Sequence, residues 1–140
     1  MSKIDSLGET IDYTNARIEH LKMIQNVIQR MSTSSTVIKR YAVVVALAVS
    51  GSANLVGKPD LLVVGGMAMA LFAFVDAEYL RTEKAFRTLF DEVRAEPSDQ
   101  APDFRMDATK TEQSFCAALV SWSVGAVYFG LVALILIGLL

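Results

Sequence analysis

The chain has 140 residues, enough for one ordinary domain but too short for two. Hydrophobic residues make up 53% and charged residues 20%, and the two kinds are separated along the sequence instead of being interleaved. Three windows carry no charge at all: residues 41–57, 61–75 and 113–140. Because a soluble domain alternates apolar and polar residues at the helix or strand period, this separation excludes an ordinary soluble domain and indicates a small integral membrane protein.

Catalytic and metal-dependent classes are also excluded by composition. The single Cys116 rules out a disulfide framework, and one cysteine with one histidine rules out a typical zinc site. We predict no cofactor and no enzymatic activity, because the sequence contains no recognisable nucleophile, base or metal cluster. His20 is interpreted as a surface or interface histidine, and Cys116 as a small apolar residue of a transmembrane helix. The first residues lack the basic and apolar regions of a signal peptide.

The first predicted element is an amphipathic helix that begins at about Asp12, after a frayed start over residues 1–11. One face of this helix is apolar at helical spacing: Ile18, Leu21, Ile24, Ile28 and Met31. The run 32–36, Ser-Thr-Ser-Ser-Thr, predicts a kink or an elbow. Lys39 and Arg40 then stand directly before the first apolar window, where long basic side chains reach lipid headgroups.

A transmembrane hairpin follows. The sequence Gly57-Lys-Pro-Asp60 predicts a tight turn, with glycine ending one helix and proline opening the next. We expect the second helix to run from about Leu61 to Ala95, well past its apolar window, because no glycine or proline interrupts residues 76–94. Glu83 and Arg87 are spaced for an i,i+4 ion pair. This extended part and the first helix are expected to pack through apolar residues: Ile18, Leu21, Ile24, Ile28, Phe86, Leu89 and Phe90.

The last predicted element is a third transmembrane helix. Thr109 to Glu112 has the spacing of a capping box, and the apolar run continues through Phe115 to Leu140. One continuous helix over this run would rise about 39 Å at 1.5 Å per residue, more than a full span. Gly65 and Gly66 in the second helix favour close helix packing.

The predicted fold is therefore an all-α integral membrane protein: an N-terminal amphipathic helix, a transmembrane hairpin whose second helix extends into the cytoplasm, and a third C-terminal transmembrane helix. Its parts are a cytoplasmic helix over residues 1–36, the hairpin over 37–75, a cytoplasmic extension and loop over 76–112, and the last span over 113–140. Residues 1–40 and 76–112 each hold six of the lysines and arginines, against Lys58 alone in the turn. Positive charge favours the cytoplasmic side, so the C-terminus is expected outside a bacterial inner membrane.

Three residues are candidates for lining a pore: Ser50, Asn54 and Asp76. Asp76 stands just after a window of only 15 apolar residues, which places it at the membrane boundary. It either forms an ion pair at the helix end, with Lys39 or Arg40, or contributes to a carboxylate ring at the mouth of an oligomeric pore. Ser50 and Asn54 continue the stripe of Ala42 and Ala46 at a spacing of four, which is typical of close helix packing and also of a narrow aqueous pore.

Basic residues of the predicted cytoplasmic part form the second candidate site. Most have acidic neighbours, as on any solvated helix face, but in a symmetric oligomer each would form a ring able to hold an anionic ligand such as a single strand. The candidates for oligonucleotide binding are Arg17, Lys22, Arg81, Lys84 and Arg87.

The sequence also resembles a known group of proteins. Residues 74–94, Phe-Val-Asp-Ala-Glu-Tyr-Leu-Arg-Thr-Glu-Lys-Ala-Phe-Arg-Thr-Leu-Phe-Asp-Glu-Val-Arg, preceded by Arg-Ile-Glu-His-Leu-Lys-Met-Ile-Gln at residues 17–25, resemble the small transmembrane effectors of the Hailong anti-phage defence system. A more distant resemblance is to SLATT-type effectors. The likeness covers roughly residues 15–95.

The resemblance implies an oligomeric channel, taken as a tetramer, that depolarises the cell. Its ligand would be a single-stranded oligonucleotide, made by a co-encoded nucleotidyltransferase and sensed by the cytoplasmic helices; membrane lipid is the other expected partner. Two alternatives remain open from the residues alone: a membrane anchor or scaffold for a cytosolic partner, and a holin-like pore toxin that needs no ligand.

Overall fold

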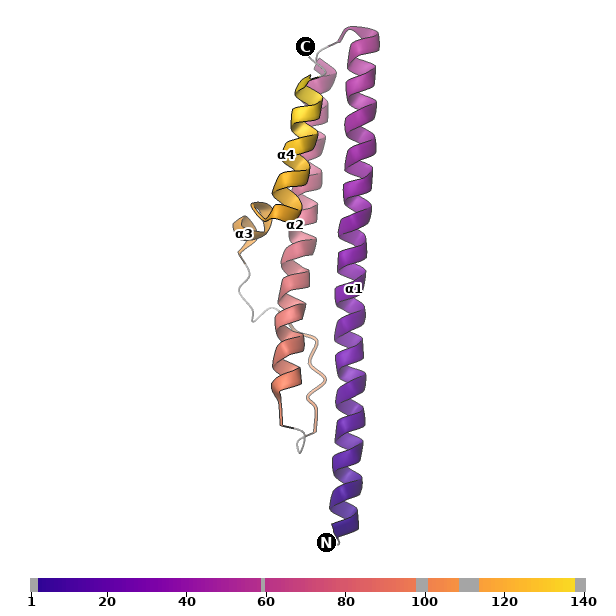
Figure 1. The fold of residues 1–140 in the computed structure, drawn as a ribbon, viewed down its shortest axis with the longest axis vertical. Coiled ribbons are helices and arrows are strands. Elements are labelled where there is room, and N and C mark those ends of the chain that lie inside the picture. Colours follow the sequence, from indigo (N-terminus) through magenta and orange to yellow (C-terminus); the bar gives the residue numbers. More distant parts are fainter. Residues whose placement is uncertain (1–2, 59, 98–100, 109–113, 138–140) are drawn as a thin grey trace. The chain divides into compact units, whose positions relative to one another are not determined.

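A computed structural model describes residues 3–58, 60–97, 101–108 and 114–137, without the side chains of residues 3–11 and Asn54. The described residues form α1 (Lys3–Val56), α2 (Asp60–Ala95), α3 (Phe115–Leu119) and α4 (Trp122–Ile137), and contain no strand (Figure 1). The all-helical prediction is confirmed for this part of the chain. α1 and α2 are each long and apolar enough to cross a membrane.

The chain divides into two compact units, and α1 and α2 each contribute to both. The first unit consists of Met1–Met31 with Thr82–Glu112, and the second of Ser32–Arg81 with Gln113–Leu140. These limits fall a few residues from the predicted boundaries after residues 36 and 75. Both units are therefore built from segments that are distant in the sequence.

In the first unit, Ile24, Leu89 and Val93 form a small buried core between α1 and α2. Around them pack the partly buried side chains Leu21, Ile28, Phe86, Phe90 and Ala108. These residues include most of the predicted packing face. Ile18 is the exception, because its side chain is 45% exposed.

In the second unit, α1, α2 and α4 lie side by side around an apolar core (Figure 1). Ala42 and Ala46 of α1 are completely buried in this core, which confirms the packing interpretation for that end of the alanine–serine stripe. Gly65 of α2 also confirms its predicted role: a β-carbon there would come within 2.7 Å of Val49 Cγ1. Gly66 faces open space and plays no such part.

The hairpin turn confirms the sequence prediction at Gly57. α1 ends at Val56, and Gly57 adopts a φ of 65°, the left-handed conformation that glycine accepts without a β-carbon clash. Pro59 lies outside the described residues, and α2 begins at Asp60. The predicted helix from Leu61 to Ala95 is thus confirmed as one uninterrupted element.

Two features of α1 differ from the prediction. The helix begins at Lys3 instead of at about Asp12, and it continues through residues 32–36 without a kink or elbow. The hydroxyl groups of this run do not compete with the helix. Thr36 Oγ1 donates to the Ser32 carbonyl one turn earlier, at 3.1 Å, and Ser35 donates to Asp76.

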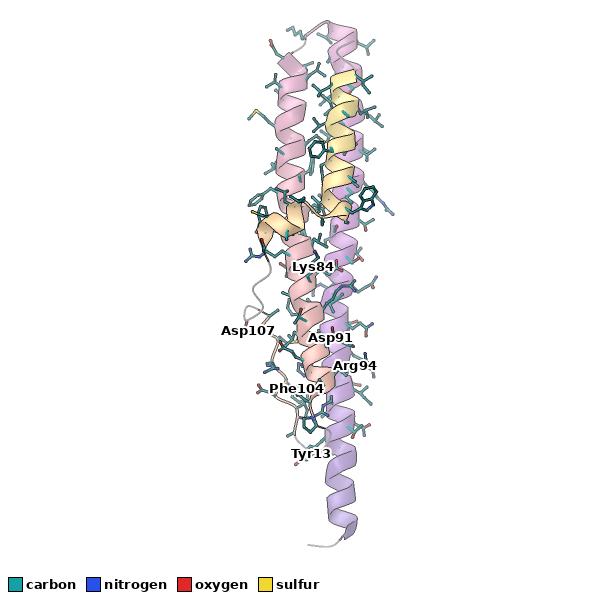
Figure 2. All side chains as sticks on the ribbon, turned by 60° about the vertical axis from the view of Figure 1, so that its left-hand side comes forward. Tyr13, Lys84, Asp91, Arg94, Phe104 and Asp107 are labelled. Atoms are coloured by element: carbon teal, nitrogen blue, oxygen red, sulfur yellow. The ribbon has the colours of Figure 1, made fainter. Side chains whose placement is uncertain are left out.

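The predicted single C-terminal helix is wrong, because the chain breaks it at Val120 and Ser121. Ser114 caps the start of α3, because its side chain accepts a hydrogen bond from the Ala117 amide, and the helix ends after the five residues Phe115–Leu119. α3 is turned sideways from α4 (Figures 1 and 2). The 16 residues of α4 rise only about 24 Å, against about 39 Å for the expected helix. The predicted capping box at residues 109–112 lies outside the described residues.

Candidate functional site

A buried ion pair joins α1 to α2 in the second unit. Lys39 Nζ lies 2.6 Å from Asp76 Oδ2, and Ser35 Oγ donates to Asp76 Oδ1 at 2.5 Å. Lys39 Nζ also donates to Ser35 Oγ at 2.7 Å, which closes a triangle of polar contacts. The three side chains meet because Ser35 and Lys39 are one turn apart on the same face of α1.

The burial of this cluster is uneven. Asp76 has no exposed surface, whereas the Lys39 side chain is 21% exposed. Tyr128 of α4 is buried as well and belongs to the same apolar core as Ala77, the residue after Asp76. An isolated buried carboxylate costs several kcal/mol, and the lysine and the serine hydroxyl together offset that cost.

This arrangement decides between the two partners predicted for Asp76: the ion pair forms with Lys39, while Arg40 is exposed. Because Asp76 is completely buried within one chain, it offers no surface to a pore in the single subunit. Its role at a pore mouth in an oligomer stays a prediction.

The other two pore candidates lie further along α1. Ser50 is half-buried and donates to the Ala46 carbonyl at 2.9 Å, so its own helix satisfies the hydroxyl. The side chain of Asn54 lies outside the described part of the chain.

Arg17 corrects a prediction for the basic candidates. It is buried and donates from Nη1 to the Glu96 carbonyl at 3.0 Å and from Nη2 to the Pro97 carbonyl at 2.5 Å. The guanidinium group therefore holds the segment after α2 and is not available to an external ligand. Long-range packing places the arginine inside the first unit, which its local sequence does not indicate.

The remaining basic candidates lie on helix surfaces. Lys22 pairs with Glu19 at 2.8 Å, Arg81 with Glu78 at 3.3 Å, and Arg87 with Glu83 at 2.7 Å. The predicted Glu83–Arg87 pair is thus confirmed. Lys84 is half-buried on α2 (Figure 2) and forms no ion pair with another described side chain. Arg81 belongs to the second unit and the other three to the first.

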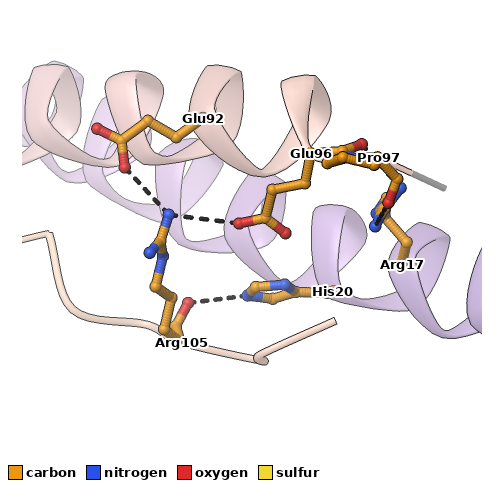
Figure 3. A network of polar contacts seen from close by, with 6 residues as sticks. All are labelled: Arg17, His20, Glu92, Glu96, Pro97 and Arg105. Atoms are coloured by element: carbon orange, nitrogen blue, oxygen red, sulfur yellow. Dashed lines mark hydrogen bonds and ion pairs between the residues drawn. The ribbon is translucent and has the colours of Figure 1, made fainter. Parts of the chain in front are cut away.

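A second polar network, absent from the sequence prediction, holds residues 101–108 against α1 and α2 within the first unit (Figure 3). We call this segment the strap. His20 Nε2 lies 2.8 Å from the Arg105 carbonyl oxygen, and its ring lies 5.4 Å from that of Phe104. Arg105 reaches back to Glu92 at 3.3 Å and Glu96 at 3.4 Å. Of the two interpretations of His20, the surface one is wrong, since the residue is only 1% exposed, and the histidine lies at an interface between α1 and residues 104–105 of the same chain.

No local signal in the sequence identifies the strap. His20 and Arg105 are 85 positions apart, and Phe104 adopts a φ of 49°, which is uncommon outside glycine. Within the described ranges, no group of three or more His, Cys, Asp or Glu side chains is placed to hold a metal ion. The comparisons add no relative: no family model, no curated protein and no solved structure matches the chain.

Proposed function

We propose that the protein is an oligomeric ion channel of a bacterial inner membrane and acts as an anti-phage effector gated by an oligonucleotide. The membrane part of this proposal is supported by the exposure of the apolar helices. Their most apolar windows are only 17% and 28% buried within the chain. The core helix of a soluble protein would be mostly buried, so these surfaces require lipid or other subunits around them.

The observation that carries the channel proposal is the Asp76–Lys39 pair. Ionisable groups within a membrane-spanning bundle are costly, and they typically mark ion pathways or moving elements. A simple anchor needs no such group. This pair connects α1 and α2, and both helices continue into the first unit. A rearrangement of the first unit can therefore reach the ion pair through either helix.

A groove of about 410 Å³ between α1 and α2 in the first unit supports a ligand at that end. It is lined by Gln25, Ile28, Gln29, Arg87, Phe90 and Asp91. Amide side chains hydrogen-bond base edges, an aromatic ring stacks on bases, and arginine contacts phosphate. A ligand shifts the channel only by binding one state more tightly than the other.

Planar-bilayer recording of the purified chain, with and without short single-stranded DNA, tests the proposal. We expect ion conductance that changes when the oligonucleotide is added to the side carrying the first unit. Addition to the opposite side serves as the control. A chain that inserts but passes no ions would support a scaffold instead, and conductance indifferent to oligonucleotide on both sides would support a ligand-independent pore.

A further inference from the structure

The second unit contains an apolar groove between α2 and α4 that the ion pair does not use. Its volume is about 640 Å³, within the range of roughly 300–1,000 Å³ typical of small-molecule sites. Gly66, Ala70 and Ala73 form its floor on α2, and Trp122, Phe129 and Val132 are among the residues on the α4 side. We propose that this groove binds the acyl chain of a membrane phospholipid.

The groove has a defined direction across the predicted membrane. Phe115 of α3 lies 5.1 Å from Phe74, and Ile135 of α4 approaches the position of a β-carbon on Gly65 to 3.6 Å. α3 and α4 therefore follow the apolar window 61–75 from its charged end to its outer part. One end of the groove lies near the level of Asp76, and the rest lies beside purely apolar residues.

The polarity of the residues that line the groove changes along the same direction. Only Trp122 and Tyr128 contribute polar side-chain atoms, and Tyr128 is buried. Trp122, at the charged end, is 88% exposed. An indole group with an apolar body and one N–H donor is typical of the headgroup boundary. An apolar slot with one exposed donor, the indole N–H of Trp122, at the boundary end matches an acyl chain and its ester group.

A second copy of the chain fits this groove less well. Close packing of transmembrane helices requires backbones in near contact. Here the sideways turn at Val120 and Ser121 leaves a cavity between α2 and α4. The lipid assignment rests on the membrane location in the proposed function.

Trp122 is the only tryptophan and lines the groove, so its fluorescence reports the occupant. The full-length protein is reconstituted in phosphatidylcholine whose acyl chains carry bromine, a short-range quencher, and is then extracted into detergent with unbrominated lipid. We expect residual quenching of Trp122 from the retained chain. Gly66→Leu should abolish it by filling the groove, because a β-carbon at Gly66 meets no other atom within 4 Å.

Gly130→Leu is the matched control, since Gly130 also faces open space but does not line the groove. It should keep the residual quenching, and Ala70→Leu, as a second filling variant, should lose it. The absence of residual quenching in the unchanged protein, or equal quenching in all four proteins, would overturn the assignment.

Two further measurements separate the ways in which the proposal can fail. Rapid disulfide cross-linking between two copies carrying Gly66→Cys and Cys116→Ser would assign the groove to a second copy and overturn the lipid. Alkaline carbonate extraction tests membrane insertion itself. A protein released by carbonate would refute the membrane location and the lipid site together, whereas an inserted protein without residual quenching would refute the lipid site alone.

Discussion

Gly65 of α2 approaches Val49 of α1 so closely that a β-carbon on the glycine would lie 2.7 Å from Val49 Cγ1. Valine is short and stiff, so it cannot move aside without disturbing the core. We expect Gly65→Ala to destabilise the second unit by about 1–3 kcal/mol, the usual cost of overpacking. The neighbouring Gly66→Ala should be neutral or slightly stabilising, because alanine favours a helix by about 1 kcal/mol over glycine. Thermal unfolding in detergent compares the two variants, and equal stability would contradict the contact.

The Lys39–Asp76 pair predicts a marked non-additivity. Lys39→Met leaves a completely buried carboxylate without its cation, and breaking a buried pair in this way costs about 3–5 kcal/mol. Adding Asp76→Asn removes the unpaired charge, and we expect it to restore much of the lost stability. Chemical unfolding of the two single variants and the double variant measures the coupling free energy. A double variant as unstable as the sum of its parts would show that the pair is not coupled.

The strap predicts a change in proteolysis. His20→Ala removes the partner of the Arg105 carbonyl and the ring beside Phe104, and an unsatisfied buried group costs about 1–3 kcal/mol. Trypsin should therefore cleave after Arg105 faster in this variant than in the unchanged protein. Lys22→Ala is the control, because it removes only an exposed pair. Unchanged cleavage at Arg105 in His20→Ala would exclude a stabilising role of the histidine.

The proposed ligand response predicts an effect of charge on α2. Lys84→Glu or Arg87→Glu should weaken the response of the channel to oligonucleotide, because each places a negative charge where phosphate would approach. Membrane insertion should be unchanged. Lys22→Glu tests whether a basic residue of α1 contributes in the same way. Bilayer recording with titrated single-stranded DNA measures the response, and an unaltered titration in the α2 variants would remove these residues from the ligand site.

Local patterns predicted the features that depend on neighbouring residues. The stop at Gly57, the uninterrupted helix before Ala95 and the Glu83–Arg87 pair all follow from spacing within a few turns. The contact of His20 with Arg105 joins residues 85 positions apart, so no local pattern encodes it. The contact of Ser35, within the uninterrupted run 32–36 of α1, with Asp76 likewise joins residues 41 positions apart.

The broken C-terminal helix illustrates a different limit. The run 113–140 contains no proline and no charge, so hydropathy predicts one long helix. A β-carbon at Gly125 would lie 3.4 Å from the Val120 carbonyl oxygen, an ordinary van der Waals distance, so the turn does not require glycine there. Gly125 is therefore no signal of the break.

Each unit consists of two segments that are distant in the sequence, and this determines the order in which the units can fold during synthesis. Arg17 meets the Pro97 carbonyl 80 residues later, so the first unit cannot close until α2 has been completed. The second unit then still lacks α4, although Ser35, Lys39 and Asp76 have all been made. The polar triangle can thus form at the stage of a two-helix intermediate, before α4 packs into the unit. A nascent chain stalled after residue 112 would contain the ion pair between α1 and α2 but would lack α4.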